Sequence, residues 1–304
     1  MQSVADLNHQ ILGLVVHVAR LFFWLALMVA VFVPLERFFS VRRAKLFYRG
    51  WATNLGWYFI NGLTPVFLLG PPSALIAMVI HAILPATITG AAAMLPLWVR
   101  MVAAMVVGEI GFYWGHRWSH QIPLLWRFHA IHHSAEHVSF LVNTRAHPVD
   151  MVFTRLCGLV LLYAFGLASP VGPHPTLVPA LVLFVGSMWS FFIHANLRWR
   201  LGPFEELISS PAFHHWHHTK DDHKDHNYSS MLPFMDRMFG TFYLPKREWP
   251  AEYGIAAAMP SGVGEQLLHP LIGGRPSGGA ARNNGAEQPS IGAGSAKSAF
   301  PADL

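Results

Sequence analysis

Histidine is the residue type whose number and position single it out for chemistry. The chain holds 19 histidines beside 16 acidic residues, and 15 of the histidines fall between His116 and His226. Neutral imidazole binds iron, zinc, copper and nickel, so this concentration indicates a metal site without choosing the metal.

The spacing of these histidines is regular. His116 and His120 form an HxxxH pair, and two further clusters follow the pattern HxxHH. Residues three or four apart share one face of a helix, so each cluster can direct imidazoles toward a common point. Eight imidazoles are more than one ion can use, which predicts two metal ions, each with about four nitrogen ligands and an open position for oxygen or water. These three histidine boxes are His116 and His120, then His129, His132 and His133, then His214, His217 and His218.

The chain that carries the boxes is unusually apolar. Hydrophobic residues make up 53% of it and charged residues 12%, against roughly 25% charged in an average soluble domain. Apolar runs close to the ~20 residues that cross a bilayer recur along it. The single cysteine, Cys157, lies in one such run, where we expect it to fill core space, since one cysteine provides neither a disulfide framework nor a cysteine zinc site.

These runs predict an all-α integral membrane protein with four to five transmembrane helices and a cytoplasmic helical cap that carries a histidine-rich di-metal site. The second run breaks at Gly70, Pro71 and Pro72, so we expect one span plus a re-entrant or interfacial piece there. The first run contains Arg20, which either marks the outer end of a shorter span or faces a polar interior. The runs cover residues 11–35, 54–84, 99–114, 151–167 and 177–193.

Basic residues give the expected orientation. Five of them follow the first run closely and, by the positive-inside tendency, place that loop in the cytoplasm. An odd number of crossings then puts all three boxes on the cytoplasmic face, and we expect a bacterial inner membrane. The net charge of +5 comes without a nucleic-acid recognition motif, so no nucleic-acid partner is expected. The five basic residues are Arg37, Arg42, Arg43, Lys45 and Arg49.

Composition divides the chain into three expected regions. Residues 1–98 are an N-terminal transmembrane region, residues 99–250 hold the histidine boxes, and residues 251–304 form a tail. From Gly273 onward the tail is rich in small and polar residues, so we expect it to be largely disordered. The first residues lack a basic region and a cleavage site, so no cleavable signal peptide is expected.

Residues 100 to 245 or so resemble the fatty acid hydroxylase and sterol desaturase superfamily. Three further segments carry this resemblance together with the histidine boxes, in the same order and spacing. They are TRAHP at 144–148, HANL at 194–197 and NYSSMLPFMDRMFGTFY at 227–243.

The resemblance implies a membrane di-iron oxygenase. Its boxes would bind two iron ions, which zinc can replace on purification, and it would hydroxylate a lipid-like substrate such as an acyl chain or sterol using O₂ and two electrons. Desaturation by the same site is the alternative. The chain has no GxGxxG loop, CxxCH motif or iron–sulfur cysteines, so the electrons would come from a separate donor such as a ferredoxin or cytochrome with its reductase.

Several other residues have an expected place in this site. His194 resembles an additional ligand position of the family, while Arg198 stands where some relatives carry another histidine. His147 is interpreted either as an outlying ligand or hydrogen-bond partner of the site or as a turn cap. We expect Asn227, Tyr228 and Asp236 to orient the third box through hydrogen bonds. Four more histidines are expected to face solvent or surround the ligands: His137, His215, His223 and His226.

A second class of function is a divalent-metal transporter or sensor. Transport sites lie near the bilayer midplane on broken helices, whereas the boxes lie outside the apolar runs. A membrane zinc protease is disfavoured because the chain has no HExxH motif. The sequence therefore favours an oxygenase.

Overall fold

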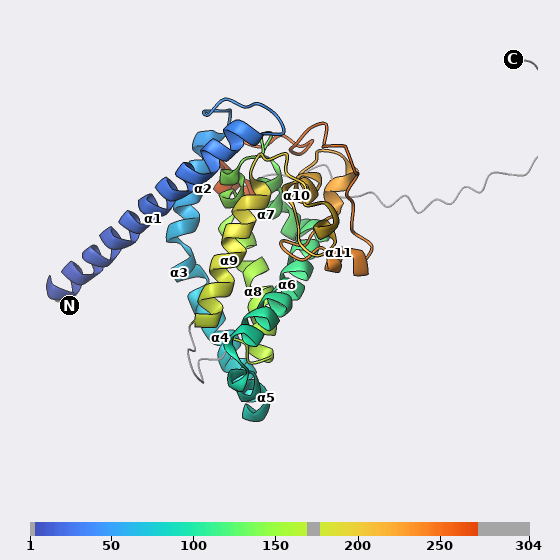
Figure 1. Ribbon diagram of the computed structural model, residues 1–304. Coiled ribbons are helices and arrows are strands. Elements are labelled where there is room, and N and C mark those ends of the chain that lie inside the picture. The colour runs from blue at the N-terminus through green and yellow to red at the C-terminus, as the bar shows by residue number, and fades with distance from the viewer. Residues whose placement is uncertain (1–3, 169–176, 273–304) are drawn as a thin grey trace, which may run out of the picture.

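The computed structural model describes residues 4–168 and 177–272 as a helical protein with a bundle at one end and a cap at the other (Figure 1). Most of the 168–176 connector and the tail from Gly273, which we expect to be disordered, lie outside the described residues. In the part that is described, β structure is limited to one isolated bridge between Thr219 and Tyr253. The predicted all-α fold is confirmed.

Twelve α-helices and four short 3₁₀ segments make up the described part of the chain. In chain order these are α1 (Val4–Phe39), α2 (Trp51–Leu63), α3 (Pro65–Leu68), α4 (Gly70–Ile83), α5 (Ala86–Ala91), η1 (Ala92–Met94), α6 (Leu97–Gln121), α7 (Pro123–His133), η2 (Phe140–Thr144), α8 (Pro148–Ala164), α9 (Leu177–His194), η3 (Gly202–Glu206), α10 (Pro211–His217), η4 (Asp222–Asp225), α11 (Phe234–Met238) and α12 (Val263–Ile272).

Three helical segments among the described residues are long and apolar enough to cross a membrane: Asn8–Phe39, Leu97–Gln121 and Leu177–His194. They correspond to the first, third and fifth apolar runs. The fourth run forms α8, whose 17 residues are fewer than the ~20 that cross a bilayer. The predicted number of crossings, four to five, and the side on which the cap lies both stay predictions.

The second apolar run is divided into α2, α3 and α4. Helix α3 ends at Leu68, and Pro71 and Pro72 lie in the first turn of α4. Proline is tolerated there because the first backbone N–H groups of a helix have no partner within it. The prolines therefore begin a helix at the predicted break.

Helix α1 runs without interruption through Arg20, whose side chain is exposed. Arg20 thus does not face a polar interior within the described part of the chain. A helix of this length extends about 54 Å, well beyond the ~30 Å hydrocarbon core of a bilayer. The helix is long enough for Arg20 to lie outside the core while later residues cross it.

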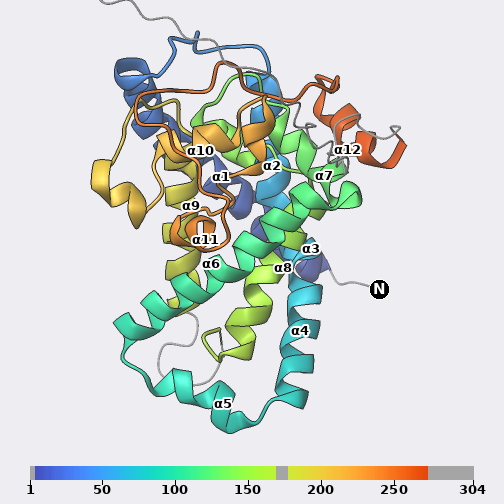
Figure 2. The same ribbon diagram turned by 90° about the vertical axis from the view of Figure 1, so that its right-hand side faces the viewer.

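Helices α6 and α8 lie side by side at unusually close range (Figure 2). Small residues permit this approach: a Cβ atom added at Gly111 would lie 2.4 Å from the carbonyl oxygen of Cys157, and one at Gly115 would lie 3.0 Å from its Sγ. Cys157 thus fills space against Gly115. This contact fixes the relation between the helix that carries the first box and the helix that begins at Pro148.

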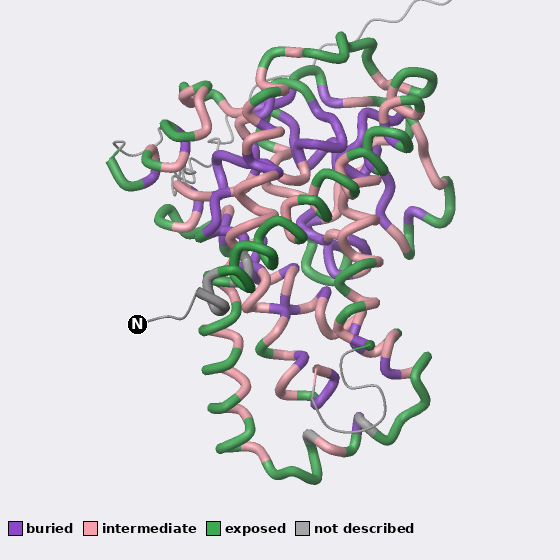
Figure 3. The backbone as a smooth tube through the Cα atoms, turned by 90° about the vertical axis from the view of Figure 1, so that its left-hand side faces the viewer, coloured by how far each residue is buried: buried purple, intermediate pink, exposed green. Residues whose placement is uncertain are grey.

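Burial is concentrated at the cap, where the end of α6, the start of α8 and the end of α9 meet α7 and α10 (Figure 3). The other end of the bundle is mostly intermediate or exposed, although its side chains are apolar. Examples are Phe67, Met78 and Ile83, each more than 60% exposed. Apolar exposure of this kind suits contact with lipid.

Replacing Gly111 with alanine should destabilise the protein. Alanine normally stabilises a helix relative to glycine by ~1 kcal/mol, but here the added methyl group meets backbone atoms that cannot move freely. We expect the free energy of unfolding to fall by about 1–3 kcal/mol, measured by thermal unfolding in detergent. Gly13→Ala is the matched control, since nothing lies within 4 Å of its added Cβ. Equal stability of the two variants would contradict close α6–α8 packing.

Candidate metal centre

Nine histidines come together at the cap in two adjacent groups. Within each group, the candidate ligand atoms lie within 4.8 Å of one another. Every member is buried except His120, which is partly buried. The first group is His116, His120, His129, His133 and His217, and the second group is His132, His194, His214 and His218.

Local helical geometry explains how the boxes supply these groups. His129 and His133, one turn apart near the end of α7, belong to the first group, while His132 belongs to the second. The third box divides the other way, because His214 and the C-cap residue His218 join the second group and His217 joins the first. Each HxxHH box therefore contributes to both groups.

The inward-facing nitrogens are close together. In the first group, Nε2 of His116 lies 3.1 Å from Nε2 of His129 and 3.0 Å from Nε2 of His217. In the second group, Nε2 of His194 lies 2.9 Å from Nε2 of His214 and 3.2 Å from Nε2 of His132. The Nε2 atoms thus converge on two neighbouring points.

Backbone carbonyl groups fix the opposite nitrogen of several rings. Nδ1 of His116 donates to the carbonyl of Tyr228 at 2.6 Å, and Nδ1 of His217 donates to that of His226 at 2.7 Å. In the second group, Nδ1 of His194 donates to the carbonyl of Ser190 at 2.7 Å. A proton held on Nδ1 leaves a lone pair on Nε2, the form in which imidazole binds a metal.

A cation fits between these converging nitrogens. Lone pairs facing one another at about 3 Å repel unless a positive charge lies between them. His120 Nε2 is buried and has no hydrogen-bond partner among the described residues, as expected for an atom that awaits a metal. Burial, reinforced by neighbouring histidines, lowers the pKa of the box residues outside the candidate spans and keeps them neutral. These residues are His132, His133, His214, His217 and His218.

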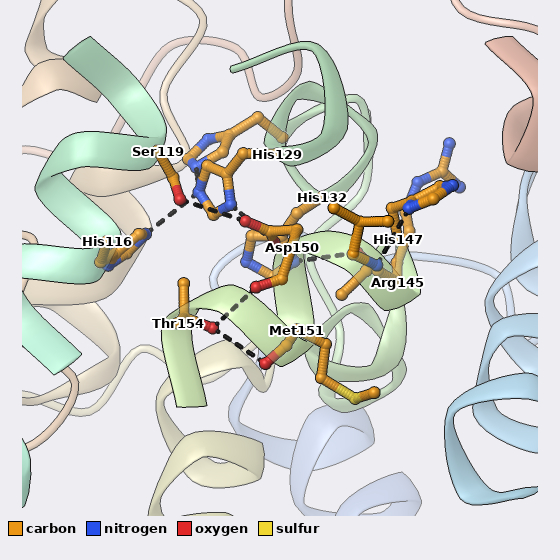
Figure 4. Close-up of polar contacts among 12 residues, drawn as sticks. His116, Ser119, His129, His132, Arg145, His147, Asp150, Met151 and Thr154 are labelled. Carbon is orange, nitrogen blue, oxygen red and sulfur yellow. Dashed lines mark hydrogen bonds and ion pairs between the residues drawn. The ribbon is translucent and has the colours of Figure 1, made fainter. Parts of the chain in front are cut away.

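Two carboxylates orient rings of the first group. Asp150 is buried at the start of α8 and accepts from Nδ1 of His129 at 2.9 Å and from the hydroxyl of Ser119 at 3.2 Å (Figure 4). Asp225 accepts from Nδ1 of His120 at 3.1 Å. A carboxylate behind a histidine fixes its tautomer and strengthens it as a ligand.

Sequence analysis missed both carboxylates. The signal for Asp150 was available, since it is an isolated acidic residue two positions after the His147-Pro148 step and directly before an apolar run. Asp225 lies in a charged segment that reads as solvent-exposed, so nothing in its neighbours distinguished it.

The segment 227–243 holds the first and third boxes together. The Asp236 carboxylate accepts from the amides of Tyr228 and Ser229 and from the Thr241 hydroxyl, which fixes the Tyr228 carbonyl that His116 uses. Asn227 has a left-handed backbone with φ of 58°. Its side-chain amide donates to the carbonyl of Phe213 in α10 at 2.8 Å.

His147 and His215 lie outside both groups. His147 caps α8, because its Nδ1 accepts from the amide of Val149 while its Nε2 donates to the carbonyl of Leu267. His215 is fully buried and bonds to the Tyr253 hydroxyl and the Ala195 carbonyl.

Of the other expected positions, Arg198 and His137 are exposed, and His223 and His226 are partly buried. The carbonyl of His226, rather than its ring, contacts a box residue. Where some relatives have another histidine, the exposed Arg198 supplies nothing to the second group.

The arrangement defines a class of protein: a helical membrane protein in which two neighbouring sets of neutral imidazoles can hold two transition-metal ions. Comparison with known proteins agrees. Residues 101–241 match the fatty acid hydroxylase family. The match covers the region that holds the histidine boxes, a little under half of the chain.

Several characterised proteins are similar to this chain. It is 33% identical to the ornithine lipid hydroxylase OlsE of Rhizobium tropici over 180 residues. These residues are 58% of this chain and 51% of that protein. It is 30% identical to alkylglycerol monooxygenase of Xenopus tropicalis, over 46% of this chain and 29% of the relative. It is 32% identical to methylsterol monooxygenase 2-2 of Arabidopsis thaliana, over 48% of this chain and 55% of the relative.

The chain therefore spans from about three-tenths to just over half of the length of these three relatives. No solved structure matches it significantly.

Asp150→Asn should weaken metal binding at the first group. Asparagine keeps the shape of the side chain but loses the charge that orients His129, so we expect metal affinity to fall about 10- to 100-fold. Competition with a chelator, followed by metal analysis, measures this. Asp222→Asn, at an exposed aspartate near the same end of the molecule, is the control. Unchanged affinity in Asp150→Asn would refute the orienting role.

Metal-free protein should lose stability as the pH falls below about 6.5, the ordinary histidine value. The fold lowers the pKa of buried box histidines, so the unfolded chain binds more protons than the folded chain in this range and the free energy of unfolding decreases. Well above pH 6.5 these histidines are neutral in both the folded and the unfolded chain, so their contribution to the pH dependence vanishes. Denaturant unfolding from pH 7.5 to 5.0 measures the slope, and a flat profile would contradict neutral buried imidazoles.

Proposed function

We propose that this protein is a membrane-bound di-iron oxygenase that hydroxylates a lipid-like substrate using O₂ and two externally supplied electrons. The observation that carries the proposal is the pair of buried histidine groups directly beside an apolar cavity. The names of its relatives, a lipid hydroxylase and two monooxygenases, support hydroxylation over desaturation.

The cavity lies among α6, α8 and α9 and has a volume of about 370 Å³, within the usual range of ligand pockets. Most of its lining residues are apolar, including Phe112, Leu162 and Val182. It adjoins both groups: the ring of Phe112 lies 5.4 Å from that of His116, and Ser190, another lining residue, bonds His194. An acyl chain or sterol entering from the bilayer would meet the metals at this end.

In this proposal, the nine histidines hold two irons, which would supply the activation of O₂ that side chains cannot perform. The protein's own residues do the rest. Asp150 and Asp225 keep the rings of His129 and His120 in the ligand tautomer, and the apolar walls exclude water from the reacting carbon. The Ser190 hydroxyl donates to the side-chain oxygen of Asn143 at 2.5 Å. This bond fixes the cavity wall one helical turn before His194.

We further propose that the protein lies in a bacterial inner membrane with its metal site on the cytoplasmic face. The basic loop after α1 supports this orientation. An acidic electron donor, such as a ferredoxin or a cytochrome, would receive electrons from its reductase and dock on the cap. A polar hollow of about 390 Å³ there is lined by three basic residues, Arg49, Arg145 and Lys220, and one acidic residue, Glu136. The Arg145 carbonyl accepts from the ring of His132 at 3.0 Å.

Iron analysis of the purified protein tests the metal centre. We expect about two irons per chain, with His217→Ala losing iron mainly from the first group and His214→Ala mainly from the second. Both variants should lose lipid hydroxylation in a reconstituted assay, because each removes a proposed ligand. His81→Ala, at an exposed histidine on α4, should keep both irons and full activity. Metal retained at wild-type levels by both ligand variants would refute the assignment.

A further inference from the structure

Arg155 is a charged residue on the wall of the α6–α8–α9 cavity. It is only partly exposed, and it lies in the middle of α8 among apolar neighbours. No hydrogen bond or ion pair joins it to another of the described residues. The packing of the helices gives no reason for a charged side chain at this position.

Three other polar residues of the cavity have partners in the protein. Thr154 donates to the carbonyl of Asp150, and Ser190 donates to Asn143. Glu109 is the acidic residue of the lining, and its Oε1 accepts from the amides of Met231 and Leu232. Glu109 and Arg155 form no ion pair, so the carboxylate does not neutralise the guanidinium.

An unpaired guanidinium in apolar surroundings is costly, and ionisable residues in such places usually serve a ligand. The cost disappears when an anion binds, and guanidinium matches carboxylate and phosphate oxygens with two parallel hydrogen bonds. An anion brought by the ligand is the partner that fits.

Arg155 is also close to the reacting end of the cavity. It follows Asp150, the partner of His129, by five residues along α8, which is about 7.5 Å of helix axis. Helical side chains tilt toward the N-terminus, and the N-terminus of α8 is the end near the metal groups. The cavity continues beyond Arg155 along apolar residues such as Gly158 and Leu162.

We propose that Arg155 binds the anionic group, a carboxylate or a phosphate, of the lipid in this cavity, so that the substrate is an anionic lipid. The inference rests on the proposed lipid-oxidising function and names the substrate class of that site. The apolar remainder of the cavity accommodates the hydrocarbon part, and the guanidinium selects against uncharged alcohols, esters and sterols.

Binding of four labelled probes to the full-length protein in detergent tests this inference. Hexadecanoate is compared with hexadecanol, and dihexadecanoyl phosphatidic acid with dihexadecanoylglycerol. We expect at least one anionic probe to bind about 10- to 100-fold more tightly than its neutral counterpart, as charge-assisted hydrogen bonds allow. Preference within the first pair identifies a free fatty acid, and preference within the second identifies a phospholipid headgroup.

Variants assign the preference to Arg155. Arg155→Gln should remove the difference between anionic and neutral probes, and Arg155→Lys should keep part of it because the charge remains. Arg247→Gln, at an exposed arginine outside the cavity, should leave the ratio unchanged. Equal binding of anionic and neutral probes by the wild type would overturn the proposal, as would a ratio that survives in Arg155→Gln. The wild-type comparison stands even if Arg155→Gln does not fold.

The binding assay also separates this inference from the proposed function. Preference for an anionic probe without any hydroxylation would overturn the oxygenase and leave an anionic-lipid site. Iron-dependent hydroxylation of neutral and anionic lipids with equal affinity would overturn the role of Arg155 and leave the oxygenase.

Discussion

Mutual repulsion among buried imidazole nitrogens is the constraint on which the rest of the structure depends. Neighbouring Nε2 atoms approach within 2.9 to 3.2 Å in both groups, and the rings are withdrawn from water. A cation among the nitrogens would offset this repulsion, and each ring must also be held from behind. The fold meets the second requirement with local acceptors, the Ser190 and His226 carbonyls, and with acceptors from farther along the chain, Asp150 and the Tyr228 carbonyl.

The parts of the site that follow from short-range spacing were predictable. A pair at i and i+4 and two HxxHH boxes impose their geometry on any helix, so the convergence of these residues could be expected from sequence. The helical class followed equally directly from the apolar runs. The division of His132 from His129 and His133 could not be predicted, because it depends on where α9 and α10 lie relative to α7.

Features set by long-range packing escaped prediction for the same reason. Asp150 and Asp225 act on rings that lie 21 and 105 positions away in the chain, and local sequence does not record such partners. The 17 residues of α8 show a related limit. Hydrophobicity marked this run as a span but could not show that it packs closely on α6 through Gly111.

The sharing of each HxxHH box between the two groups has a consequence for assembly. Neither group is complete until α7 and α10 are both in place, so no single helix pair forms a finished half-site. Filling one group therefore pre-organises rings of the other, since His132 and His133 are adjacent on one helix and His217 and His218 are adjacent at the end of another. Metal uptake by the two groups should consequently be cooperative.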